Sequence, residues 1–241
     1  DGGWSGAEWT DAATVPVTVL VKTTGALPGT PYWLALHQAL AAAFAPSHTD
    51  IPLSFTAGSD AYVIYGRPRL VEPLAETAFR GWAICRAAFR ALDPRIYSGA
   101  VHEVTLGLPS TVGGLEVPFT VPFSIGAVVT AGRASITNAG TAATGLVLRI
   151  DGPVQEPRVT LTAPGGAVRT LRYLDDLASG QWLVIDTKAA TSYLNGNVSR
   201  RGRTVGGWAG FLLEPGTSEI AFDAALYDAS ALLTVSWRDA Y

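Results

Sequence analysis

Carboxylate side chains are the residues of this chain best suited to acid–base chemistry. Glycoside hydrolysis needs two carboxylates that face each other across a cleft. The C-terminal half supplies five candidates, Asp175, Asp176, Asp186, Glu214 and Glu219. Asp175 and Asp176 are adjacent, so their side chains point in different directions in a helix or a strand. The pattern therefore favours a polar turn over a catalytic pair.

The single cysteine and the three histidines do not form a metal-binding pattern. Cys85 stands alone, and His37, His48 and His102 fit neither a CxxC nor an HExxH motif. We expect Cys85 to be a buried, unreactive thiol. A GxSxG nucleophile elbow is also absent from the sequence. The sequence therefore predicts no catalytic residues, no metal site and no cofactor.

Nucleotide, nucleic-acid and membrane binding find no support either. No two glycines stand at positions i and i+2, so a GxGxxG loop cannot occur, and there is no Gly-Lys-Ser/Thr motif. The formal net charge is −3, so the chain lacks the excess of basic residues that is typical of a nucleic-acid-binding protein. The longest apolar stretch, residues 33–46, is interrupted by His37 and Gln38 and predicts no membrane span.

Three arginines form the sharpest charge cluster of the sequence. Arg200, Arg201 and Arg203 follow the Asn195-Gly196 dipeptide, which is typical of a tight hairpin turn. Guanidinium groups at such a position can pair with an acidic partner surface. The alternative interpretation is a solvated hairpin tip.

Aromatic side chains near the same hairpin are candidates for binding sugars. Tyr193 and Trp208 offer rigid apolar faces with a polar edge, on which a sugar ring can stack. Packing in a core or an interface is the alternative, and it is favoured for Trp182 and Trp237, which lie in strand patterns.

The composition favours a β-rich fold with part of its surface covered. Charged residues make up 15% of the 241 residues, against about 25% in average domains, while 48% are hydrophobic. The 26 glycines and 15 prolines suit frequent turns between short strands.

In the N-terminal half, a strand and a helix can be predicted. Apolar residues alternate with others from Val15 to Lys22, as in a half-buried strand. Thr30 and Pro31 open a helix over about residues 31–45, which Pro46 ends. Residues 79–89 fit either a helix or a strand buried on both faces.

The segment Asp93–Ser98 reads as an extended connection, and we place a domain boundary just after it, at residue 100. Further on, short strands and turns recur, as in a β-sandwich. The expected strands include a short one at Tyr62–Tyr65 before the boundary and, after it, segments at Phe119–Ile125, Leu146–Ile150, Val159–Ala163, Trp182–Ile185 and Leu233–Trp237, with reversals at Ala163–Gly166, Asn195-Gly196 and Pro215-Gly216.

Taken together, several segments resemble the distal tail protein family of long-tailed, non-contractile bacteriophages. The resemblance covers nearly the whole chain and depends on the order of its parts. These are the Val15–Lys22 strand, the Pro31–Ala45 helix, Asp93–Ser98, Ile136–Gly140, Gly180–Thr187, Tyr193–Gly196, Pro215–Thr217 and Trp237–Tyr241.

The resemblance implies a mainly β fold with two domains. Residues 1–100 would form a ring-forming N-terminal β domain with the helix at about 31–45, and residues 101–241 a galectin-like antiparallel β-sandwich. The galectin sugar-binding signature is missing around every His and Trp of this chain. The galectin-like label therefore concerns shape and does not imply sugar binding.

The same resemblance implies a structural protein of the virion tail tip or baseplate, assembled in the cytoplasm of the bacterial host, and not an enzyme. It implies a homo-hexameric ring that joins the tail tube protein to the tip hub and receptor-binding proteins, with no nucleic-acid partner and no membrane insertion. The low charge agrees with surfaces buried between subunits. We expect most ring contacts from the N-terminal half, at Trp4, Trp9, Val17, Val19 and Trp33.

Two other functions remain open from the sequence. One is a carbohydrate-binding module that recognises a host cell-wall polysaccharide through Tyr193 and Trp208. The other is a wall-degrading glycosidase, which requires two carboxylates to converge in a cleft.

Overall fold

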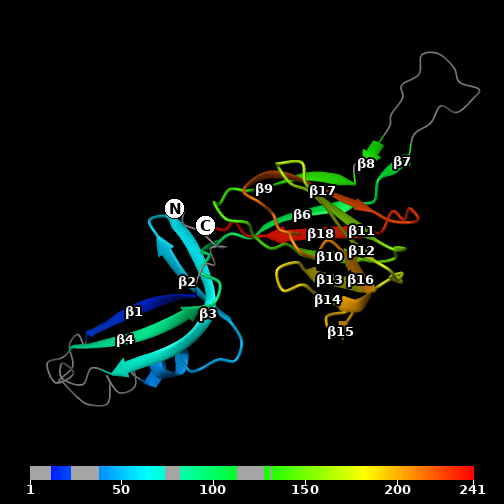
Figure 1. The fold of residues 1–241 in the computed structure, drawn as a ribbon. Helices are drawn as coiled ribbons and strands as arrows, with labels where there is room; N and C mark the ends of the chain where they lie inside the picture. The colour runs from blue at the N-terminus through cyan, green and yellow to red at the C-terminus, as the bar shows by residue number, and fades with distance from the viewer. Residues whose placement is uncertain (1–11, 23–37, 74–81, 113–127, 131) are drawn as a thin grey trace, which may run out of the picture. The chain divides into compact units, whose positions relative to one another are not determined.

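The protein is described by a computed structural model that covers residues 12–22, 38–73, 82–112, 128–130 and 132–241. The chain forms two compact units, Asp1–Gly99 and Ala100–Tyr241 (Figure 1). Antiparallel strands dominate both units, so the predicted mainly β fold is confirmed. Within these residues, no helix is long and apolar enough to cross a bilayer.

The first unit is built around one antiparallel sheet with the strand order β1-β4-β3-β2. The predicted first strand is confirmed as β1, and the described part of the ambiguous segment at 79–89, from residue 82 onward, belongs to a strand, β4. The strand predicted at Tyr62–Tyr65 lies near the start of the much longer β3, which shifts register against β4 between Pro68 and Leu70. The bounds are β1 Ala13–Lys22, β2 Ile51–Ala57, β3 Asp60–Pro73, β4 Trp82–Ala91 and the short β5, Tyr97–Ser98, beside β3.

The core of this unit is small. Ile64, Phe89 and Ala91 are buried, and half-buried apolar side chains from β1, β2 and the residue Phe44 pack against them. Residues 38–43 are helical, and Phe44 donates its N–H to the Leu40 carbonyl at the end of that turn. The predicted helix is therefore present in its second half, while residues 31–37 lie outside the described residues.

The second unit contains two antiparallel sheets. One has the order β15-β14-β13-β10-β18-β6, and the other β16-β12-β11-β17-β9. The bounds are β6 His102–Gly107, β9 Arg133–Asn138, β10 Val147–Asp151, β11 Arg158–Thr162, β12 Val168–Tyr173, β13 Trp182–Asp186, β14 Thr191–Leu194, β15 Val198–Ser199, β16 Thr204–Gly206, β17 Gly216–Asp223 and β18 Leu232–Trp237. A separate ribbon pairs β7, Ser110–Val112, with β8, Val128–Thr130.

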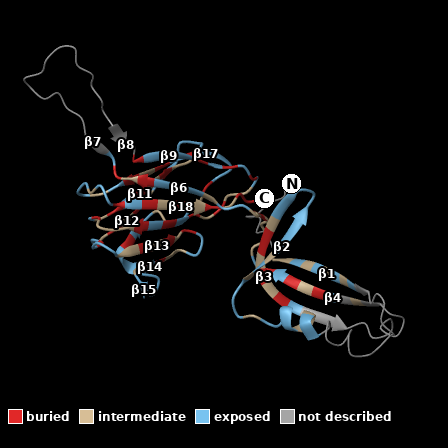
Figure 2. Cartoon of the chain, turned by 180° about the vertical axis from the view of Figure 1, so that it is seen from behind, coloured by how far each residue is buried: buried red, intermediate tan, exposed pale blue. Residues whose placement is uncertain are grey.

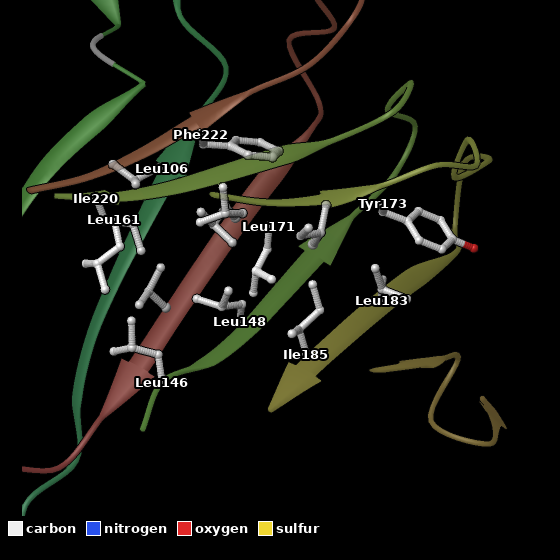
Figure 3. Close-up of a cluster of buried hydrophobic side chains, with 14 of the residues drawn as sticks. Leu106, Leu146, Leu148, Leu161, Leu171, Tyr173, Leu183, Ile185, Ile220 and Phe222 are labelled. Atoms are coloured by element: carbon white, nitrogen blue, oxygen red, sulfur yellow. The ribbon is translucent and has the colours of Figure 1, made fainter. Parts of the chain in front are cut away.

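The inner faces of these two sheets form one large apolar core. The longer strands alternate buried and more exposed residues, so every second side chain points between the sheets (Figure 2). Leu148 and Leu183 come from neighbouring strands of the six-stranded sheet, and Leu171 and Phe222 come from the other sheet (Figure 3). All four are at most 1% exposed. The predicted β-sandwich is confirmed.

The turn predictions have different outcomes. Asn195 and Gly196 both have positive φ, as the I′ turn between β14 and β15 requires. Gly166 closes the β11–β12 hairpin with φ 82°. The reversal predicted at Pro215-Gly216 is wrong. Gly216 is the first residue of β17, and a hairpin at this point would require β17 to pair with β16, the preceding strand. Strand β16 pairs with β12 instead. The expected strand at Phe119–Ile125 lies outside the described residues.

Candidate interaction surfaces

Strand β1 lies at one end of the first sheet and carries two of the predicted interface residues. Val17 and Val19 are half-buried, on the same face as Val15, which packs against the core. On the opposite face, the side chain of Leu20 is 63% exposed. Trp4, Trp9 and Trp33, the other N-terminal candidates, lie outside the described residues.

Pro16 determines which main-chain groups of β1 face the free edge. It pairs with Ala88 of β4 but has no N–H, so its main chain must point away from β4. Alternate residues of an antiparallel strand share this direction. Thr18 and Leu20 therefore direct their N–H and C=O groups toward the free edge. Among the described strands, β1 pairs only with β4.

Strand β2 forms the other end of the path and repeats this arrangement. Pro52 pairs with Tyr65 of β3 and also has no N–H to donate. Ser54 and Thr56 lie two and four residues further along, so their main chains point outward with that of Pro52. Within the described part of the chain, the path of the sheet thus ends in two different edges, each interrupted by a proline.

The three predicted interface arginines lie at a single turn. Arg201–Arg203 form the 3₁₀ helix η2 between β15 and β16. The carbonyl of Arg200 accepts bonds from the N–H groups of Arg203 and Thr204. The Arg201 guanidinium lies 4.0 Å from the centre of the Trp208 ring, an attractive cation–π arrangement. The turn is therefore fixed by contacts within the chain.

Arg203 forms an ion pair with Asp175. Its Nε lies 3.0 Å from both carboxylate oxygens, and its Nη2 also bonds Oδ1. These bonds hold the pKa of Asp175 below its ordinary value and raise the pKa of Arg203. Burial, followed by the charge of Asp175, raises the pKa of the neighbouring Tyr173. Asp175, a possible catalytic carboxylate by sequence, thus anchors the arginine turn.

The two predicted sugar-stacking residues do not share a face. Ser192 is buried and its hydroxyl lies 2.9 Å from that of Thr204. Tyr193, the next residue in β14, therefore points outward from the six-stranded sheet and is 39% exposed. Trp208 packs against the sandwich core after β16 and donates its Nε1–H to the Thr204 carbonyl.

Sequence reasoning missed a polar cluster on the outer face of the six-stranded sheet. Arg149 binds Asp151 through Nε and Nη2, and its guanidinium lies 4.7 Å from the centre of the Trp182 ring. The Oδ1 atom of Asn195 accepts a hydrogen bond from the main-chain N–H of Trp182. The alternation of residues in β10 was enough to predict that Arg149 and Asp151 lie on one face of the strand. Trp182 could not be predicted in this way, because only the pairing of β10 with β13 places it beside them.

The segments Ile136–Gly140 and Trp237–Tyr241, both part of the sequence resemblance, pack against each other. Trp237 donates its Nε1–H to the Thr137 carbonyl. Asp239 accepts the N–H of Ala139, and its other oxygen lies 3.0 Å from Nε2 of His102. His102 in turn stacks on Trp237 with ring centres 5.5 Å apart. These segments form a buried polar junction with a structural role.

Within the described ranges, no three His, Cys, Asp or Glu side chains gather as a metal site would require. One small hollow of about 50 Å³ lies beside Glu156, Arg158 and Asp223. It is far below the volume of a typical small-molecule site.

The fold matches that of a phage protein. This chain superposes on the SPP1 Dit protein with a TM-score of 0.60 and 13% sequence identity, over 95% of this chain and 79% of the Dit chain. The SPP1 Dit protein is described as a paradigm of the hub adsorption apparatus in phages that infect Gram-positive bacteria. The chain has the Dit fold. The similarity to distal tail proteins inferred from the sequence is thus confirmed for the fold.

A second solved structure is less similar to this chain. A chain of the phage P2 baseplate, in its activated conformation with Ca, matches over 93% of this chain and 78% of its own length, at 10% identity and a TM-score of 0.49. No protein-family model matches the sequence of the Dit-like chain. No curated protein matches it either.

Proposed function

We propose that this Dit-like chain is a structural component of a bacteriophage tail tip, where it forms a ring-shaped hub. In this role, a ring of six copies joins the tail tube to the tip and receptor-binding proteins. The observation that carries the proposal is the fold shared with SPP1 Dit over 95% of the chain. The ring size and the neighbours come from the distal tail resemblance.

The free edges of the first unit support assembly into a ring. A closed ring is built from heterologous contacts, in which two different surfaces of each subunit meet. The β1 and β2 edges are two such surfaces, since they lie at opposite ends of one sheet. Strand addition across these edges supplies main-chain hydrogen bonds. In this arrangement, Thr18 and Leu20 of one copy bond to the next.

Apolar side chains on both faces of β1 support the same interface. Leu20 is 63% exposed, and Val17 and Val19 remain half-buried, in the isolated chain. Obligate interfaces bury apolar surface of this kind. The low proportion of charged residues in the whole chain, 15%, agrees with extensive contact between subunits.

Native mass spectrometry of the full chain tests the ring. We expect a discrete closed oligomer of six copies in the wild type. Thr18→Pro removes an N–H that points to the free edge and leaves the β1–β4 bonds intact, so this variant should be monomeric. Thr18→Val keeps the N–H and the β-branched shape, and should assemble as the wild type does.

Circular dichroism of both variants checks that the β1–β4 pairing survives. A Thr18→Pro variant that still forms the ring would exclude the β1 edge as the interface. A wild type that is monomeric at all concentrations and within the assembled particle would refute the ring itself.

A further inference from the structure

The two edge strands of the first sheet carry almost no charge. Strand β2, Ile51–Ala57, contains no charged residue, and β1, Ala13–Lys22, contains only Lys22, at its end. Edge strands that stay free in solution commonly carry charged side chains, lysine above all, which discourage pairing with another strand. These two strands lack such charges along most of their length, so both are suited to pairing.

One face of β2 continues the apolar surface of the core toward the end of the strand. Ile51 and Leu53 pack against the core of this unit. Phe55 lies two residues further along, on the same face. Its side chain is 37% exposed, and its ring stacks on that of Tyr62 with ring centres 5.7 Å apart. Phe55 is therefore oriented by its neighbour but covered on only part of its surface.

The core face of β1 is also covered only in part. Val15 packs against the same core, and Val17 and Val19 follow it on this face, where both remain half-buried. The opposite face of β1 carries Thr18 and Leu20, which are exposed. Each edge strand thus extends the apolar core face of the sheet to its edge.

The pairings within one copy determine how the two edge strands run. Strand β1 pairs antiparallel with β4, β4 with β3, and β3 with β2. Three reversals leave β2 running opposite to β1. If a second copy lies beside the first with its core face on the same side, its β2 therefore runs antiparallel to β1 of the first copy. If the second copy is turned over, the two strands run parallel and the core faces point to opposite sides.

A closed ring allows only the first of these arrangements. Successive copies in a cyclic ring are related by rotation about one axis. Such a rotation keeps the core face of every copy on the same side of the sheet. A parallel junction would turn every second copy over, and repeating that step does not close a cyclic ring of six. The β1 and β2 edges of neighbouring copies must therefore meet antiparallel, with their core faces continuous.

We infer that neighbouring copies of this chain join through an antiparallel β1–β2 junction, in which Phe55 of one copy packs beside Val17 and Val19 of the next. The junction belongs to the ring, so the inference rests on the proposed function and adds the direction and the face of the contact. The occupant of each edge is the opposite edge of a second copy, because two uncharged strands with matching apolar faces then cover each other.

Cysteine pairs in the full chain test the face of the contact. All variants carry Cys85→Ser, so the introduced cysteines are the only thiols. Opposite residues of antiparallel strands have Cα atoms about 4.5–5.5 Å apart, within reach of a disulfide. Phe55→Cys is combined with Val17→Cys or Val19→Cys on the same face, and with Thr18→Cys as the opposite-face control. Mild oxidation of the assembled ring and a non-reducing gel measure the covalent oligomers.

The better of the two same-face pairs should form about tenfold more disulfide than the pair of Phe55→Cys and Thr18→Cys. The reason is that the side chain at position 18 points to the other side of the sheet. In the ring, the favoured pair should give a ladder of covalent oligomers up to six copies.

Ala57→Cys reports the direction of the junction without knowledge of its register. Ala57 follows Phe55 by two residues on the same face of β2. In an antiparallel junction, the β1 residue that crosslinks best with Ala57→Cys lies two positions nearer the start of β1 than the best partner of Phe55→Cys. In a parallel junction it lies two positions nearer the end. We expect a move from Val19 to Val17, or from Val17 to Val15.

A second measurement does not depend on disulfides. Phe55→Ser should raise the concentration at which the ring dissociates about tenfold or more, because it removes an apolar side chain that packs on the next copy. Leu226→Ser, at a position 60% exposed in the second unit, should leave this concentration unchanged. Circular dichroism of every variant checks that the strands remain folded.

Three outcomes would overturn the inference: a ring in which the Thr18→Cys pair crosslinks best, a ring in which the best partner moves toward the end of β1, or a ring in which Phe55→Cys alone crosslinks to itself. Native mass spectrometry of the reduced samples reports the ring separately. A ring without the expected crosslinks contradicts only the junction, whereas a chain that stays monomeric contradicts the proposed assembly.

Discussion

The main chain of Gly140 passes so close to that of Ala240 that a Cβ atom on the glycine would lie 1.9 Å from the Ala240 carbonyl oxygen. The atom that would be struck is backbone, so it cannot rotate away as a flexible side chain does. Asn138 adds to the same contact, because its Oδ1 accepts the N–H of Gly140 at 3.0 Å. The C-terminal segment thus packs directly against the segment that follows β9.

Gly140→Ala should destabilise the second unit by about 2 kcal/mol or more, because the two segments must separate to admit the methyl group. Urea unfolding followed by tryptophan fluorescence measures the change. Gly165→Ala is the matched control, since a Cβ there meets no atom within 4 Å. Equal stability of the two variants would show that the 136–140 and 237–241 segments can move apart freely.

The Asp175–Arg203 pair should make folding stability depend on pH. Arg203 holds the pKa of Asp175 below 3.8, its ordinary value. A carboxyl with a lowered pKa stabilises the folded state above its unfolded pKa, and this contribution is lost as the pH falls through the folded pKa. The wild type should therefore exceed Asp175→Asn in urea midpoint at about pH 5, and the difference should shrink as the pH falls below the unfolded pKa of Asp175 and through its folded pKa.

The neighbouring Asp176 is exposed and provides the control for this experiment. Asp176→Asn should follow the wild-type curve at every pH. A constant difference between Asp175→Asn and the wild type down to the lowest pH would contradict the role assigned to the ion pair.

Leucines at two positions of the six-stranded sheet should differ sharply in their contribution to stability. Leu148 is fully buried between the sheets, whereas Leu232, on the neighbouring strand, is 41% exposed. Leu148→Ala should lower the free energy of unfolding by about 2 to 5 kcal/mol, because it leaves a cavity. Leu232→Ala should change it by less than about 1 kcal/mol. Chemical denaturation of both variants decides whether the sandwich core lies where the structure places it.

Asp239 should stabilise the junction mainly as a hydrogen-bond acceptor. Its side chain is buried, and Oδ1 accepts the Ala139 N–H at 3.0 Å. Asp239→Ala leaves that N–H without its acceptor and should lower the free energy of unfolding by about 1 to 3 kcal/mol. Asp239→Asn keeps an acceptor oxygen and should lose less. Thermal unfolding at neutral pH measures both, and indistinguishable variants would argue against this role.

Local patterns in the sequence were sufficient to predict much of the fold. Alternation identified β1, and the Asn195-Gly196 pair identified a I′ turn, because both signals depend on neighbouring residues. Residues 79–89 remained ambiguous, because the apolar residues of this segment also fit a helical period. In the structure, Ala87 and Phe89 lie on the buried face of β4, and Arg86 and Arg90 lie on its exposed face. The reversal expected at Pro215-Gly216 failed because turn residues also occur where a strand begins.

The interaction surfaces could be predicted only in part. The arginine cluster was found from its composition, but its acidic partner lies 28 positions from Arg203. His102 and Asp239 are 137 positions apart. No local pattern connects such residues, since the pairing of strands brings them together.

The prolines at the two free edges of the first sheet have a consequence for subunits that have not yet assembled. An exposed edge strand invites unrelated chains to add to it and to grow into fibrous aggregates. Pro16 and Pro52 each leave a gap in the row of N–H donors, so an arriving strand can bond along only part of either edge. Newly made chains are thereby less prone to polymerise without limit, while a short, correctly aligned contact remains available to them.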